Sequence, residues 1–229
     1  MTRSWRLLPH DRTAIERLAT GLAVSPVVAQ LLLNRGLTSP EAARTFLQAP
    51  LTGLHPPREL PGIAEATERL ATAVRDGRRI VVYGDYDVDG LTGTAILLQT
   101  LKMLGAQADF YVPHRLDEGY GLNLDALGQL AQDGASAIVT VDCGIGSLAE
   151  AAEARRLGLE LIITDHHPCQ EQLPDAAVVV HPRRPGSTYP FDGLSGSGVA
   201  FKLAWALCQH ASGGEKVTER FREHLVECV

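Results

Sequence analysis

The sequence predicts an α/β fold: a parallel β-sheet flanked by helices, with a small helical appendage on its N-terminal side. From residue 62 onward, short apolar runs alternate with amphipathic segments of helical length. Several of those runs end directly in carboxylate or imidazole side chains, and in a parallel sheet ligands bind at the carboxyl ends of the strands. We therefore divide the chain into a helical region with a linker, residues 1–61, and an α/β domain, residues 62–229.

The first region has the signals of short helices. Thr38 and Glu41 have the spacing of a capping box, and Pro40 suits the first turn of the helix that follows. Apolar side chains then recur at helical spacing, at Ala42, Ala43, Phe46 and Leu47. Prolines at four positions between residues 50 and 61 predict a linker or strap.

In the α/β domain, strands and helices are expected to alternate. The expected strands are residues 80–83, 108–112, 137–141, 161–164 and 176–180. The expected helices are residues 64–76, 91–104, 122–133, 147–157 and 199–210, followed by a charged helix at 219–227. Strands that are apolar throughout need cover on both faces, which is typical of a parallel sheet.

Composition limits the classes of function. A chain of 229 residues with 45% hydrophobic residues can bury the core of a domain. The net charge of −6 argues against a strongly basic surface, although a local basic groove is compatible with it. The four cysteines form no CxxC pair, which favours free thiols in a reduced, cytoplasmic setting. We expect neither a signal peptide nor a membrane span, because no apolar stretch is long enough.

Three aspartates, Asp85, Asp87 and Asp89, follow the first expected strand, before a helix expected to begin near Leu91. Alternate residues of an extended chain point the same way, and like charges crowded together are costly unless a cation offsets them. A solvated turn or a helix cap is the simpler alternative, but a cap does not require three carboxylates. A calcium loop would close with glutamate where this chain has Ile96. The pattern indicates a divalent-metal site.

Two later strands end in further candidate ligands. Asp142 follows the third strand; alone it would be a helix cap at least as often as a ligand, but near the other strand ends it could bridge two metals. Asp165, His166 and His167 follow the fourth strand. Neutral imidazole is a good ligand for manganese or zinc. Because adjacent residues diverge, we expect one histidine on metal and one on substrate, with Asp165 orienting an imidazole.

Two loops are candidates for substrate contacts. His114 and Arg115 follow the second strand, where Arg115 could hold a phosphate bidentately or lie solvated. Ser195, Gly196 and Gly198 open the last long helix; its amides suit an anion, although a plain helix start has the same appearance.

Metal-activated water is the expected nucleophile. The sequence holds no Ser/His/Asp arrangement and no Walker loop, and Cys143 has no evident partner base. With two metals, one cation lowers the pKa of water while both stabilise charge on a phosphoryl group. The run His-Pro-Arg-Arg at residues 181–184 supplies additional positive charge or is a solvated loop.

The ordered motifs resemble the DHH phosphoesterase superfamily: Asp-Tyr-Asp-Val-Asp-Gly at 85–90, Asp142, and Asp-His-His at 165–167. The wider pattern resembles the RecJ single-strand DNA exonucleases, in segments 35–47, 51–60, 83–90, 114–121 and 195–202. The resemblance implies a 5′-to-3′ exonuclease that removes nucleotides from single-stranded DNA in recombination and repair, with Mn²⁺ or Mg²⁺. It also implies a single-strand-binding protein and a recombination helicase as partners.

Carried over by motif, the resemblance gives the metal ligands Asp87, Asp89, Asp142 and His166. Asp85 would be a ligand or a close neighbour, and His167 would face the scissile phosphate. The pyrophosphatase branch has a histidine where this chain has Tyr83, which argues against inorganic pyrophosphate as substrate.

The family's catalytic domain continues with a further metal-binding aspartate, a DHHA1 domain and, in RecJ, an OB-fold. This chain stops at Val229, so we expect a truncated domain that lacks those parts. Two alternatives stay open: a phosphodiesterase for short oligonucleotides or cyclic dinucleotides, and a non-catalytic scaffold. Phosphodiesterases of the first kind lack a helical leader such as residues 1–60. Non-catalytic relatives typically lose the acidic motifs, which this chain retains.

Overall fold

The computed structural model describes residue 4 and residues 6–229, which form two compact units that divide between Leu54 and His55. The part of the predicted helical region at residues 1–3 and 5 lies outside the described residues. The division into domains at residue 61 stays a prediction. Within the described residues, no single helix is long and apolar enough to cross a membrane. The pair of helices Arg12–Leu22 and Pro26–Asn34 passes that test only together, with a bend of 111° between them.

The first unit is helical, as predicted. It contains α1 (Arg12–Leu22), α2 (Pro26–Asn34), α3 (Pro40–Gln48) and the 3₁₀ turn η1 (Leu51–Gly53). Its small core consists of Ile15, Leu18, Ala29, Leu32 and Ala43. Ser39, not Thr38, is the N-cap of α3, and its hydroxyl accepts from the Ala42 amide at 3.1 Å. Pro40 explains the shift, because at the first helical position it has no amide to satisfy.

The second unit contains the predicted parallel sheet, with the strand order β2-β1-β3-β4-β5. The strands are β1 (Arg79–Gly84), β2 (Gln107–Tyr111), β3 (Ala137–Val141), β4 (Glu160–Thr164) and β5 (Val178–Val180). The chain passes from β1 to β2 on one side, then returns across β1 to β3 on the other side. The strand order therefore reverses between β1 and β3, and open α/β sheets bind ligands at such a point.

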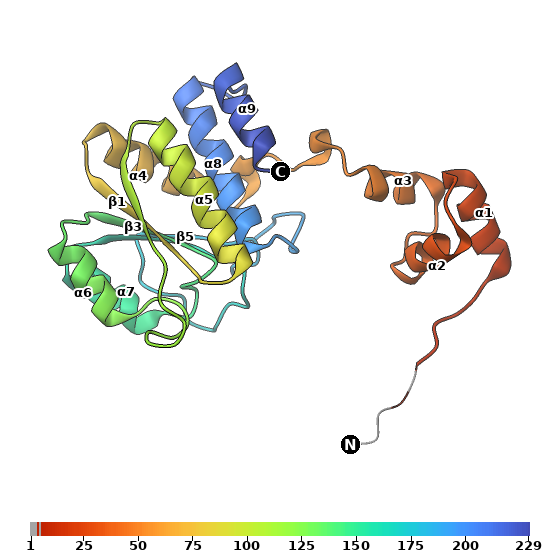
Figure 1. The fold of residues 1–229 in the computed structure, drawn as a ribbon, viewed down its shortest axis with the longest axis horizontal. Helices are drawn as coiled ribbons and strands as arrows, with labels where there is room; N and C mark the ends of the chain where they lie inside the picture. The colour runs from red at the N-terminus through yellow and green to blue at the C-terminus, as the bar shows by residue number, and fades with distance from the viewer. Residues whose placement is uncertain (1–3, 5) are drawn as a thin grey trace. The chain divides into compact units, whose positions relative to one another are not determined.

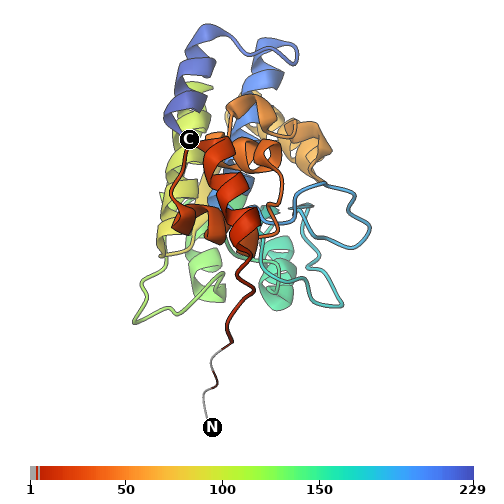
Figure 2. The ribbon, with the colours of Figure 1, turned by 90° about the vertical axis from the view of Figure 1, so that its right-hand side faces the viewer.

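Helices cover both faces of the sheet (Figure 1). One face carries α4 (Ile63–Arg75), α5 (Val88–Met103), α8 (Gly196–Ser212) and α9 (Glu219–Glu227), and the other carries α6 (Leu124–Gln132) and α7 (Leu148–Arg156). The 3₁₀ turn η2 (Pro57–Glu59) precedes α4. Alternate residues of a strand enter opposite cores: Val82 packs on the α5 side and Val81 on the α6 side. The last two helices, α8 and α9, pack against each other and are joined by the loop of residues 213–218 (Figure 2).

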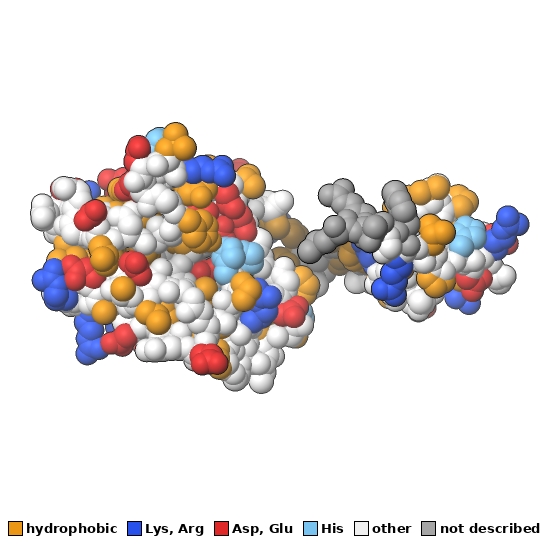
Figure 3. All heavy atoms as spheres, turned by 90° about the horizontal axis from the view of Figure 1, so that it is seen from below, with side chains coloured by type: hydrophobic (Ala, Val, Ile, Leu, Met, Phe, Trp, Pro, Cys, Tyr) orange, Lys and Arg blue, Asp and Glu red, His pale blue; other side chains and the backbone are white. Residues whose placement is uncertain are grey.

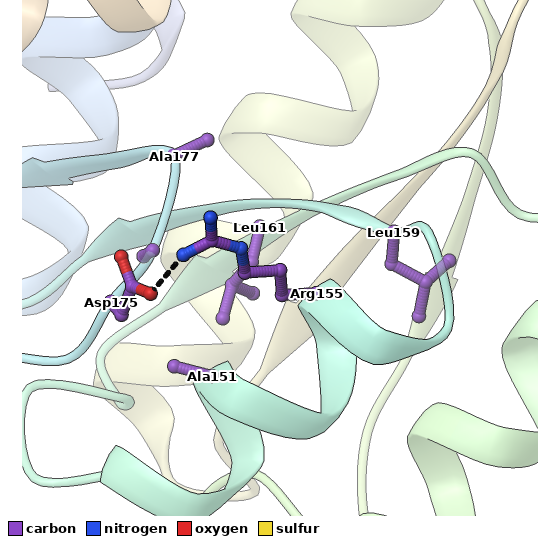
Figure 4. Close-up of a pocket in the computed structure, with 7 residues that line it drawn as sticks. Ala151, Arg155, Leu159, Leu161, Asp175 and Ala177 are labelled. Atoms are coloured by element: carbon purple, nitrogen blue, oxygen red, sulfur yellow. Dashed lines mark hydrogen bonds and ion pairs between the residues drawn. The ribbon is translucent and has the colours of Figure 1, made fainter.

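Ion pairs connect the elements at the N-terminal ends of the strands. Glu160 pairs with Arg69 at 3.0 Å and with Arg78 at 2.7 Å. A nearby pocket of about 290 Å³ lies between α7 and the starts of β4 and β5, where Arg155 forms an ion pair with Asp175 (Figure 4). This pocket lies at the opposite end of β4 from the residues Asp165 to His167, and it contains none of the predicted site residues.

Candidate metal centre

Three neighbouring strands, β1, β3 and β4, each end in a buried aspartate. Asp85, Asp142 and Asp165 follow these strands directly and are 1%, 2% and 1% exposed. Each donates its backbone amide to the last residue of the adjacent strand: Asp85 to Val141, Asp142 to Thr164 and Asp165 to Val180. The sheet register therefore brings the three carboxylates to one edge, as the sequence predicts.

The other two aspartates of the first motif lie at the start of α5. Asp87 is the N-cap, and its Oδ1 accepts from the amides of Asp89 and Gly90 at 2.8 and 2.9 Å. The helix begins at Val88, earlier than expected, so Asp85, Asp87 and Asp89 do not alternate along an extended chain. Asp89 instead faces the start of α8.

Asp142 is the centre of the site. Two groups of potential metal ligands share it: Asp85, Asp87 and Asp142, and Asp142, His166 and His167, with donor atoms within 4.8 Å in each group. Its backbone is left-handed, with φ 64°, a conformation that costs a non-glycine residue energy. Burial, together with the carboxylates of Asp89 and Asp87, raises the pKa of Asp142 to about 7.

The polar atoms at this centre fit a divalent cation. Oδ1 of Asp85 and Oδ1 of Asp142 are buried and accept no hydrogen bond from any residue that the structure describes. His166 Nε2 lies 3.1 Å from that Asp142 oxygen, close enough for both atoms to contact one ion. Buried acceptors without partners are costly, and carboxylate oxygens suit manganese or magnesium, while an added imidazole nitrogen suits manganese better than magnesium. Burial also raises the pKa of Asp85.

Asp165 differs from the other two buried aspartates because both of its oxygens are occupied. Oδ1 accepts from the amides of His166 and His167 and lies 2.8 Å from His167 Nδ1, and Oδ2 accepts from the Ile145 amide. Asp165 therefore orients the imidazole of His167, as the sequence predicts. Burial lowers the pKa of His167, but its bond to Asp165 and the nearby carboxylates outweigh this and raise it. The other ring nitrogen of His167, Nε2, contacts the hydroxyl of Tyr120.

Tyr120 lies beside His167. Its hydroxyl is 3.3 Å from the Asp142 carbonyl oxygen and 3.4 Å from His167 Nε2. Arg115, from the same loop, stacks over Tyr86, with its Cζ 5.2 Å from the ring centroid, and so lies at the rim of the site. His114 Nδ1 lies 2.7 Å from Oδ2 of Asp117. The sequence singled out this loop, but nothing in it distinguished Tyr120.

The start of α8 packs tightly against the acidic centre. The amides of Gly196 and Ser197 donate to the Asp89 carboxylate at 2.7 Å each, and the Gly198 amide donates to Oγ of Ser195. Burial raises the pKa of Asp89, but the hydrogen bonds from Ser197 and Gly196 outweigh it and lower the pKa. In this structure the helix amides therefore bind an anion of the chain itself. A Cβ at Gly196 would lie 2.4 Å from Oδ1 of Asp142, so only glycine fits.

Two side chains that the sequence suggested only as positive charge contact the Asp-His-His segment. His181 is fully buried and lies 2.7 Å from the carbonyl oxygen of His167, and Arg183 donates to the carbonyl of His166. Burial lowers the pKa of His181. Cys143 is also buried, which raises its pKa and agrees with the prediction that it is no nucleophile. On the face of this unit in Figure 3, histidine side chains lie beside acidic ones, with basic side chains nearby.

A family model described as the DHH family, N-terminal domain, matches residues 79–229. This chain belongs to the DHH family. It is 46% identical over 203 residues to the single-stranded-DNA-specific exonuclease RecJ of Bacillus subtilis, and 39% identical over 183 residues to that of Escherichia coli. These alignments cover 89% and 80% of this chain, but only 26% and 31% of those relatives.

Solved structures of RecJ share the fold. The crystal structure of exonuclease RecJ bound to manganese matches with a TM-score of 0.64 and 40% identity, over 74% of this chain and 42% of that chain. RecJ from Thermus thermophilus in complex with Mn²⁺ matches with a TM-score of 0.68 and 33% identity, over 97% of this DHH chain and 31% of that chain. Its complex with Mg²⁺ matches with a TM-score of 0.56 and 30% identity, over 97% and 27%.

Proposed function

We propose that this DHH chain carries the metal centre of a 5′-to-3′ exonuclease that hydrolyses phosphodiester bonds of single-stranded DNA in recombination and repair, in the cytoplasm. The observation that supports this most directly is that Asp142 belongs to both groups of ligand atoms. A carboxylate shared in this way can bridge two cations, the arrangement used by many nucleases and phosphatases. The similarity to RecJ supports single-stranded DNA as the substrate.

The proposed ligands of Mn²⁺ or Mg²⁺ are Asp85, Asp87, Asp89, Asp142 and His166. When bound, the cations would lower the pKa of a water molecule and stabilise charge on the phosphoryl oxygens. His167 acts differently, because Asp165 holds its Nδ1. Its Nε2 faces the side chain of Tyr120, and its raised pKa favours a protonated ring that donates to the scissile phosphate.

The substrate is proposed to enter along the rim of the site. Arg115 offers a guanidinium fork for a phosphate, and His114 adds a donor on the same loop. At the other side, the start of α8 offers the hydroxyl of Ser195, since the amides of Gly196 and Gly198 already have acceptors in the chain. A single-strand-binding protein and a recombination helicase are the proposed partners.

The test is degradation of a 5′-phosphorylated, single-stranded oligonucleotide by this chain in the presence of Mn²⁺. We expect release of mononucleotides from the 5′ end, which a label at the 3′ end distinguishes from the opposite polarity. Asp142→Asn should abolish release. Asp125→Asn is the matched control, because Asp125 is exposed on α6 and touches no proposed ligand, and it should retain activity.

The same assay separates the alternatives. Faster cleavage of dinucleotides or cyclic dinucleotides than of long strands would replace the exonuclease proposal with a small-substrate phosphodiesterase. Mn²⁺ binding without cleavage of any substrate would overturn the proposal for this chain and favour a scaffold.

A further inference from the structure

The Asp-His-His segment is held from two sides. Asp165 accepts the backbone amides of His166 and His167, so it fixes the N–H side of both residues. Their carbonyl groups point the other way, toward the segment that follows β5. There His181 and Arg183 each bind one of them. The two residues that carry the imidazoles of the site are therefore fixed through both backbone polar groups.

His181 connects these two contacts. Its Nδ1 lies 2.9 Å from the amide nitrogen of Arg183, which can only donate, so Nδ1 accepts. In the neutral ring the proton then resides on Nε2, 2.7 Å from the carbonyl oxygen of His167, which can only accept. The backbone on both sides thus selects one tautomer of His181, and the selected tautomer donates to His167.

The surroundings of His181 make it a rigid anchor. Its side chain is 0% exposed, and its own amide donates to the Pro61 carbonyl at 3.4 Å. The turn that follows is closed by Ser187, whose hydroxyl donates to the Pro182 carbonyl at 2.6 Å. Cys169 contacts the ring of His181 through its sulfur at 3.7 Å. A donor held in this way tolerates little movement of the carbonyl that it binds.

We infer that His181 is a positioning residue of the metal centre: by holding the carbonyl of His167, it keeps the imidazoles of His166 and His167 aimed at the cation and the phosphate. This inference rests on the proposed function for what those imidazoles do. A histidine that only filled the core would need a polar partner, but that partner could be any backbone group. Here both Nε2 of His181 and the fork of Arg183 bind the residues that bear the site's imidazoles.

Two variants test this. His181→Phe fills the space but cannot donate, and should weaken Mn²⁺ binding roughly tenfold or more, the usual effect of losing a group that orients a ligand. His181→Gln places an amide nitrogen where Nε2 was, and should restore most of the affinity. Titration calorimetry measures both without any nuclease assay, so a failure of the exonuclease proposal leaves this test intact.

His224→Phe is the matched control. His224 is also buried, and its Nε2 lies 2.8 Å from the Thr100 hydroxyl. Thr100 is about 18 Å along α5 from Val88, the end of the helix that lies at the metal centre. It should lower thermal stability but leave Mn²⁺ affinity unchanged. If His181→Phe is folded by circular dichroism and binds Mn²⁺ like the parent, the inference is wrong.

A measurement on the parent chain covers the case in which His181→Phe does not fold. In the metal-free chain, ¹⁵N chemical shifts should show His181 with its proton on Nε2, and the ¹³C shift of the His167 carbonyl should show a hydrogen bond. A proton on Nδ1 would overturn the inference whatever the variants do.

Discussion

Replacing Asp142 by asparagine should stabilise the metal-free chain while removing its response to manganese. The side chain of Asp142 is 3% exposed, and its pKa rises from 3.8 to about 7. Since one pKa unit corresponds to 1.36 kcal/mol, ionising this buried group costs the fold about 4 kcal/mol at pH 8. Asparagine has the same shape and tolerates the left-handed φ of 64°, so it removes the cost without adding strain.

The sign of the pH dependence follows from the direction of the shift. Because the folded pKa of Asp142 lies above its unfolded value, the favourable contribution is fully present below the unfolded value of 3.8 and is lost as pH rises through about 7. The metal-free parent should therefore lose about 4 kcal/mol relative to Asp142→Asn between pH 4 and pH 8. A variant with alanine would lose the same charge but add about 1 kcal/mol of backbone strain.

Urea unfolding followed by circular dichroism measures both effects. In EDTA at pH 8, Asp142→Asn should be the more stable protein. With Mn²⁺ at a hundred times its Kd, the parent should gain about 2.7 kcal/mol and the variant almost nothing. If the variant gains as much from Mn²⁺ as the parent, Asp142 is not the residue that the cation needs. If the two pH profiles in EDTA run parallel, the pKa of Asp142 is not raised in the metal-free fold.

Three further substitutions probe the site and the fold. His167→Ala should keep Mn²⁺ affinity but slow cleavage at least about a hundredfold, measured by calorimetry and nucleotide release; a loss of affinity as large as that of Asp142→Asn would contradict the separate roles. Gly196→Ala should weaken Mn²⁺ binding, because its Cβ would lie 2.4 Å from Oδ1 of Asp142, whereas Gly198→Ala meets nothing closer than 3.3 Å and serves as the control in the same titration. Glu160→Gln should cost about 2 kcal/mol at pH 7 through its two arginine partners. Burial raises the pKa of Glu160, but the two arginines outweigh it and lower the pKa. The stability difference between the parent and Glu160→Gln should therefore shrink as pH falls below 4.5. Urea midpoints that differ as much at acid pH as at pH 7 would refute this.

The place of the metal centre could be predicted from the sequence because it depends on strand periodicity alone. Each apolar run of four or five residues predicts a buried parallel strand, and the residue after it must emerge at the carboxyl edge of the sheet. This reasoning places Asp85, Asp142 and Asp165 together without any knowledge of the connections between the strands. The third strand even has the predicted bounds, Ala137–Val141.

The direction of Asp89 could not be predicted, because it depends on which residue caps α5. Both Asp87 and Asp89 can cap a helix, and the choice of Asp87 moves the helix start to Val88 and rotates Asp89 out of the extended pattern. The role of His181 was equally hidden. Its partner is a carbonyl 14 positions away on another strand's extension, and a histidine followed by proline and arginines gives no local sign of that contact.

The hydrogen bonds divide four of the five aspartates of this edge into two kinds. Asp165 and Asp89 accept backbone amides on both oxygens and so fix other parts of the site: the imidazoles in one case, the start of α8 in the other. Asp89 is also a proposed ligand, through the lone pairs that these amides leave. Asp85 and Asp142 each keep a buried oxygen that has no donor among the described residues, and the pKa of each is raised. A buried acceptor without a hydrogen-bond donor costs free energy, so these two oxygens destabilise the metal-free fold. A divalent cation held by these oxygens would remove that cost. Asp85 and Asp142 would therefore link the stability of the fold to cation binding, while Asp165 and Asp89 fix the imidazoles and the start of α8.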